Sequence, residues 1–118
     1  MECYLDNSAT TKPCKAAVDA EISALTELYG NPSSLHQKGV DAYMLLEKSR
    51  GTIAASLKAS PDEIYFTPCG TVSNNTAIFG TVGAKKRLGK KIVTTALEHP
   101  SVEKCMERLE ESGFEVVG

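Results

Sequence analysis

The sequence lacks an apolar run long enough to cross a bilayer, and it lacks a basic segment followed by an apolar one near its N-terminus. We therefore expect neither a transmembrane helix nor a signal peptide, and we predict a cytoplasmic location. An excess of one charge is also missing, since 13 basic and 15 acidic side chains give a net charge of −2. Nucleic acid and anionic membranes attract basic proteins, so neither partner is expected.

Cysteines are few and scattered. Cys3, Cys14, Cys69 and Cys105 form no Cys-x-x-Cys pair, so we expect reduced thiols and no disulfide scaffold. With two histidines, they also match no metal-ligand spacing, and no metal site is expected. Cys3 and Cys105 fall at apolar positions and are predicted to be small core residues, whereas Cys69 lies in a turn and is expected to be exposed.

What is present is an ordinary globular composition, 42% hydrophobic and 24% charged over 118 residues. Apolar residues recur at helical spacing from Pro13 to Tyr29, which predicts an amphipathic helix there. A second helical stretch is expected over about residues 40–57, although Gly39 and Gly51 argue against one uninterrupted helix. Residues 60–63, Ser-Pro-Asp-Glu, have the spacing of a capping box.

The second half alternates between strand and helix patterns. We predict strands over residues 64–67, 91–95 and 114–117, separated by helices over residues 73–88 and 101–111. This β-α-β-α-β order predicts an α/β fold with a mainly parallel sheet and ligand sites at the carboxyl ends of its strands. The domain prediction is a single unit, with a helical segment over 1–60 followed by the β-α-β-α-β segment over 61–118.

The turn after the first predicted strand has the features of a phosphate cradle. Gly70 allows a close backbone approach, Thr71 and Ser73 carry hydroxyls, and amides at the start of the following helix point toward an anion. The alternative is a strand-turn-helix joint whose glycine serves packing alone. Both interpretations fit this segment taken by itself.

Four segments in order resemble one family: Tyr4–Thr11 (YLDNSATT), Gly30–His36 (GNPSSLH), Ile64–Asn75 (IYFTPCGTVSNN) and Thr94–Pro100 (TTALEHP). Their order and spacing are similar to the N-terminal part of the cysteine desulfurases. These are pyridoxal-phosphate enzymes of the class V aminotransferase group, with the type I aminotransferase fold. The resemblance covers essentially the whole chain and implies a partial type I aminotransferase-like fold.

The resemblance implies roles for three residues. Gly70 and Thr71 match the positions that bind the cofactor phosphate. His99 matches the histidine that stacks on the cofactor ring and takes part in proton transfers with bound cysteine, a task that suits an imidazole. His99 is therefore the candidate catalytic residue, and Gly70, Thr71 and His99 are the candidate cofactor-binding residues.

Three further polar residues have a structural alternative. His36 lies in a segment that the family places near its active site and subunit boundary, but it is equally suited to cap the second helix. Asp6 and Asn7 resemble acid–base groups, yet an Asp-Asn-Ser sequence is also typical of a turn whose side chains bond to its own backbone. We assign Asp6 and Asn7 no catalytic role.

Some family features do not occur in this sequence. None of its ten lysines lies in a Ser-x-His-Lys motif, which in the family carries the covalently bound cofactor. The resemblance places that lysine, the aspartate on the ring nitrogen, the substrate-binding arginine and the sulfur-accepting cysteine beyond Gly118. Pro68 and Val72 also replace the serine and glutamate that are usual in the family.

The predicted function is therefore that of the N-terminal portion of a cysteine desulfurase, inactive as this chain alone. The family converts L-cysteine to L-alanine and passes the sulfur as a persulfide toward iron–sulfur clusters and other thio-cofactors. One alternative is a non-catalytic interaction module that pairs with itself, with the missing part or with a paralogue. Another is part of a related class V aminotransferase or selenocysteine lyase.

Overall fold

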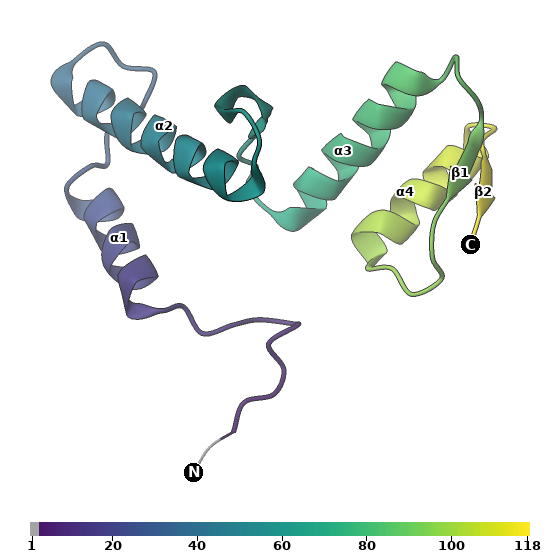
Figure 1. Ribbon diagram of the computed structural model, residues 1–118, viewed down its shortest axis with the longest axis horizontal. Coiled ribbons are helices and arrows are strands. Elements are labelled where there is room, and N and C mark those ends of the chain that lie inside the picture. Colours follow the sequence, from purple (N-terminus) through teal and green to yellow (C-terminus); the bar gives the residue numbers. More distant parts are fainter. Residues whose placement is uncertain (1–2) are drawn as a thin grey trace. The chain divides into compact units, whose positions relative to one another are not determined.

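Residues 3–118 are described by the computed structural model, and they divide into two units between Ile64 and Tyr65. The first unit is helical, and the second contains two helices and two short strands (Figure 1). Among the described residues, no helix combines the length and apolar character needed to cross a membrane.

The first unit contains helices α1, Lys15–Thr26, and α2, Gln37–Leu57, followed by a short 3-10 turn, η1, Pro61–Glu63. Both predicted helices are confirmed. Gly39 and Gly51 do not interrupt the second helix, because α2 is continuous over 21 residues. The capping box is confirmed, since the Ser60 amide donates to the Glu63 carboxylate at 2.7 Å.

The loop before α2 packs against the first turn of that helix. A Cβ at Gly39 would lie 2.2 Å from the carbonyl oxygen of Ser34, and one at Gly30 would lie 2.0 Å from the carbonyl oxygen of Lys38. The Lys38 ammonium also donates to the carbonyl of Glu27 at 3.0 Å. This close backbone approach explains why glycine stands at positions 30 and 39.

The second unit contains α3, Gly70–Lys85, then β1, Lys91–Val93, then α4, Pro100–Glu111, and finally β2, Glu115–Val117. The strands pair in parallel with Ile92 opposite Val116. The parallel arrangement predicted for these strands is confirmed, and each strand is shorter than expected.

The prediction of a strand over residues 64–67 is wrong. Those residues lie outside any helix or strand, and the sheet in the described part of the chain has two strands only. The apolar run was the reason to expect a strand, but a strand also needs a hydrogen-bonded neighbour, and none is present for this segment. The second unit is therefore α-β-α-β, with an extended lead into α3.

Side chains buried in the second unit lie on one face of α4, at Ser101, Cys105 and Leu109, which are four residues apart. The prediction that Cys105 is a core residue is confirmed. The same prediction for Cys3 is wrong, because its side chain is exposed in a segment outside any helix or strand. Cys69 is exposed, as expected.

Candidate functional site

Within residues 3–118, the first turn of α3 leaves three backbone amides without acceptors. The helix begins at Gly70, three residues earlier than the sequence predicted. Cys69 precedes it in an extended conformation and makes no side-chain capping hydrogen bond, and the first helical bond is donated by the Ser73 amide to the Cys69 carbonyl at 3.1 Å. The amides of Gly70, Thr71 and Val72 therefore remain available, at the positive end of the helix dipole.

Hydroxyl groups hold this turn in shape. The Thr67 hydroxyl donates to the Cys69 carbonyl at 3.1 Å and lies 2.5 Å from the Ser73 hydroxyl. The Ser73 hydroxyl is thus engaged within the turn, although the sequence suggested it as a donor to an anion. Within the described residues the Thr71 hydroxyl makes no hydrogen bond, so it is the side chain that can donate to a ligand here.

Gly70 has no neighbour that would exclude a side chain. A Cβ built at this position would meet no atom within 4 Å. Neither packing within this chain nor a left-handed backbone conformation requires glycine there. The open space next to three free amides gives an anion direct access to the backbone.

His99 is the N-cap of α4. Its Nδ1 atom accepts from the Ser101 amide at 3.1 Å and lies 2.9 Å from the Ser101 hydroxyl. Its Nε2 atom makes no hydrogen bond within the described part of the chain. Pro100 occupies the first helical position, where proline is favoured, and so marks the entry to this helix.

The beginnings of α3 and α4 are tied together by side chains. The Asn74 amide, one turn after Gly70, donates to the Ser101 hydroxyl at 2.8 Å. One residue further along α3 and one turn further along α4, the Cys105 thiol donates to the Asn75 side-chain oxygen at 2.8 Å. Both helices start at the same end of this unit (Figure 1), so the structure brings the Gly70–Thr71 turn and His99 into one neighbourhood.

Asn74 and Ser101 were missed by sequence reasoning. Twenty-seven positions separate them, and no local pattern connects an asparagine in one helix to a serine in another. Burial is the property that gives them weight: Ser101 is only 7% exposed. Burial also raises the pKa of the neighbouring Cys105 thiol.

The remaining polar candidates have structural roles in the first unit. His36 is the N-cap of α2, and its Nδ1 accepts from the Gly39 amide at 3.4 Å. The Asn7 side chain donates to the carbonyl of Tyr4, also at 3.4 Å. The capping interpretation of His36 and the turn interpretation of Asn7 are both confirmed.

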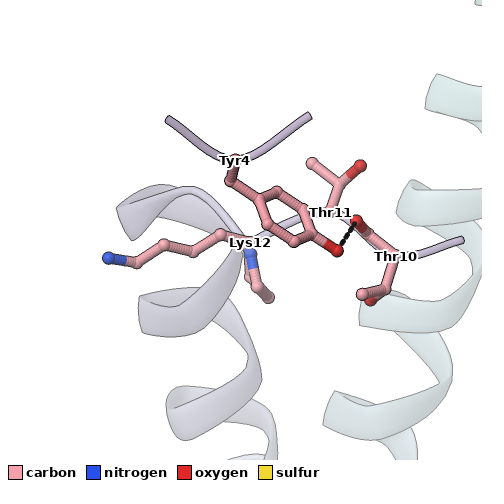
Figure 2. A pocket seen from close by; sticks show the side chains of 5 residues that line it. Tyr4, Thr10, Thr11 and Lys12 are labelled. Carbon is pink, nitrogen blue, oxygen red and sulfur yellow. Dashed lines mark hydrogen bonds between the residues drawn. The ribbon is translucent and has the colours of Figure 1, made fainter. Parts of the chain in front are cut away.

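A hollow of about 560 Å³ in the first unit is lined by Tyr4, Thr10, Thr11, Lys12 and Pro13. Figure 2 shows the Tyr4 hydroxyl donating to the Thr10 carbonyl, at 3.1 Å, with the Lys12 ammonium extending away from that bond. Among the described residues there is no cluster of three or more potential metal ligands.

Comparisons with known proteins decide the family. A sequence model described as "Aminotransferase class-V" matches residues 3–117. The chain belongs to the class V aminotransferase family. A "NifS/IcsS protein homolog" of Lactobacillus delbrueckii subsp. bulgaricus is 50% identical over 113 residues, covering 96% of this chain and 29% of that protein. A "Putative cysteine desulfurase IscS 1" of Bacillus subtilis is 39% identical over 113 residues, covering 96% of this chain and 30% of that protein.

Solved structures of this class V family agree with the fold. A "NIFS-LIKE PROTEIN" superposes with a TM-score of 0.90 at 37% identity, over 99% of this chain and 32% of that one. "SspA in complex with cysteine" superposes with a TM-score of 0.82 at 30% identity, over 93% of this chain and 32% of that one. The predicted partial α/β fold of the family is confirmed. The chain spans about three tenths of the length of its curated relatives, as expected of the N-terminal part of a cysteine desulfurase.

Class V aminotransferases depend on pyridoxal phosphate, and the first turn of α3 fits its phosphate group. Three free amides, the unbonded Thr71 hydroxyl and the open space at Gly70 form a donor set for an anion. The two departures from the family pattern do not disturb it. Pro68 lies outside the helix, and Val72 still contributes its backbone amide to the first turn.

Proposed function

We propose that this chain supplies part of the pyridoxal-phosphate site of a cysteine desulfurase that converts L-cysteine to L-alanine. Gly70 and Thr71 bind the cofactor phosphate, and His99 lies against the cofactor ring and moves a proton to and from the substrate. When bound, pyridoxal phosphate supplies the electron sink that stabilises negative charge on the substrate carbon. The complete activity needs a lysine in a Ser-x-His-Lys setting, which none of these 118 residues provides.

One observation carries the proposal: the free donors at the start of α3 and the histidine at the start of α4 are held together by the Asn74–Ser101 hydrogen bond. A phosphate at this position gains hydrogen bonds from rigid backbone amides, which need no reorganisation when the ligand arrives. His99, which is hydrogen-bonded to Ser101, has an imidazole Nε2 atom that makes no hydrogen bond within the described residues.

The relatives support the proposed substrate. SspA is described in complex with cysteine, and the curated relatives include cysteine desulfurases. For the protein described here, L-cysteine as substrate and the cytoplasm as location are part of the proposal.

The cradle can be tested on the chain itself with pyridoxine 5′-phosphate, which has no aldehyde and so cannot react with the ten lysines. We expect this ligand to shift the amide resonances of residues 69–75 in a ¹H–¹⁵N spectrum. Thr71→Ala should weaken the binding by roughly 3- to 10-fold, the usual effect of losing one hydrogen bond.

Thr76→Ala is the matched control, because Thr76 is a second exposed threonine of α3 that lies beyond the first turn. It should leave the affinity unchanged. Pyridoxine without its phosphate should produce no shifts at residues 69–75. Equal losses in Thr71→Ala and Thr76→Ala, or shifts spread away from this turn, would refute the cradle.

A further inference from the structure

His99 faces two donors from a single residue. The Ser101 amide and the Ser101 hydroxyl both lie within hydrogen-bond distance of Nδ1, at 3.1 and 2.9 Å. A backbone amide can only donate, so Nδ1 must offer a lone pair and cannot carry a proton. In a neutral imidazole the proton then resides on Nε2.

The hydroxyl of Ser101 must point its proton at the same lone pair. If it did not, two lone pairs would face each other across 2.9 Å. A hydroxyl has one proton to donate and can accept as well, and its acceptor side is taken by the Asn74 amide at 2.8 Å. The donor direction in this series of hydrogen bonds is therefore fixed: Asn74 donates to Ser101, and Ser101 donates to His99.

Burial strengthens this arrangement. Ser101 is 7% exposed and Asn74 is half-buried, so water competes little for either group. The Asn74–Ser101 hydrogen bond in such surroundings holds its direction more firmly than one on an open surface, because reversing it leaves a buried group unsatisfied.

We propose that Asn74 and Ser101 are positioning residues that hold His99 in the tautomer with its proton on Nε2. This inference builds on the proposed function in one respect: the reaction then meets His99 as a neutral hydrogen-bond donor. To take up a proton at Nε2, the ring must first give up both bonds from Ser101. The network thus leaves proton donation from Nε2 immediately open to His99, whereas proton uptake at Nε2 is not.

The tautomer is measurable without cofactor or activity. Long-range ¹H–¹⁵N spectra of the ¹⁵N-labelled full chain at alkaline pH separate the two ring nitrogens of each histidine. The chain has two histidines, and His36 is a built-in reference, because its Nδ1 accepts from the Gly39 amide alone, at 3.4 Å. We expect the ratio of Nε2–H to Nδ1–H forms to be roughly 3- to 10-fold higher at His99 than at His36.

Asn74→Asp reverses the donor direction of the hydrogen bond between residues 74 and 101 while keeping the shape of the side chain. A carboxylate only accepts, so the Ser101 hydroxyl turns toward residue 74 in a charge-assisted bond and leaves Nδ1. The His99 ratio should fall by roughly 3- to 10-fold, with no change at His36. Ser101→Ala, which removes the hydroxyl, should give a similar fall, with far-UV circular dichroism showing that the helices persist.

Asn75→Asp is the matched control. It adds the same charge one position further along α3, and its side-chain oxygen still accepts from the Cys105 thiol, so the His99 ratio should stay near that of the unaltered chain. The proposal is wrong if His99 and His36 show equal ratios, or if Asn74→Asp behaves as Asn75→Asp does. Since no pyridoxal compound is present, failure here leaves the phosphate-cradle test standing, and failure of that test leaves this one standing.

Discussion

At the scale of single residues, the four cysteines divide into one buried thiol and three exposed ones. Cys105 is 2% exposed, its thiol donates to Asn75, and burial raises its pKa above the ordinary value of 9.0. Because the thiolate is the reactive form, a raised pKa means less thiolate at any given pH. We expect iodoacetamide to label Cys105 roughly 10-fold or more slowly than the other three, as measured by peptide mass spectrometry.

The sign of the pH dependence also follows. Because burial raises the pKa of the Cys105 thiol, its labelling should increase with pH only above the range of an ordinary thiol. In denaturant all four should react alike. Equal labelling of Cys105 and Cys69 in the native chain would contradict the burial of the face of α4 on which Cys105 lies.

Residues of the candidate site differ in how visible they are in the sequence. Gly70, Thr71 and His99 stand in recognisable local patterns, a small-residue turn and a His-Pro helix entry, so they could be named beforehand. Asn74 and Ser101 could not, because their importance depends on two helices packing so that distant side chains meet at 2.8 Å.

At the scale of elements, two glycines of α2 make a matched pair. A Cβ at Gly39 would lie 2.2 Å from the Ser34 carbonyl oxygen, whereas one at Gly51 would meet nothing within 4 Å. Gly39→Ala should therefore destabilise the chain by about 1–3 kcal/mol through overpacking. Gly51→Ala should stabilise it by about 0.5–1 kcal/mol, since alanine favours the helix. Urea unfolding followed at 222 nm measures both, and the same sign for the two variants would refute the close packing of the loop on α2.

Helices were more predictable than strands for a physical reason. A helix satisfies its backbone internally, so apolar spacing and caps along one segment suffice to indicate α1, α2 and α4. A strand needs a neighbour, and residues 64–67 have the apolar composition of a strand without one. The early start of α3 was missed because Gly70 and Thr71 are weak helix formers, and their place in the helix depends on the hydroxyl-bonded turn around Thr67.

At the scale of the whole molecule, the described residues bury few apolar side chains. The buried hydrophobic set is Ala42, Ala54, Cys105 and Leu109, whereas Leu35 and Leu97 are 99% and 96% exposed. The sheet has two strands, so each strand leaves one edge unpaired. A parallel pair with open edges is marginally stable by itself and gains from further strands or a covering surface.

These open edges lead to the last prediction, that the chain associates with itself. A specific contact should bury roughly 1,000 Å² or more and persist on moderate dilution. Light scattering over a concentration series should give a mass above that of one chain.

Val93→Lys, which puts a charge on an exposed strand position (77% exposed), should weaken this association, because a lysine at a strand edge opposes pairing. Leu88→Lys is the control, since Leu88 is similarly exposed (84%) but lies outside the sheet. A monomer at every concentration would show that the two-stranded sheet needs no partner, and equal effects of the two lysines would show that association does not involve the strands.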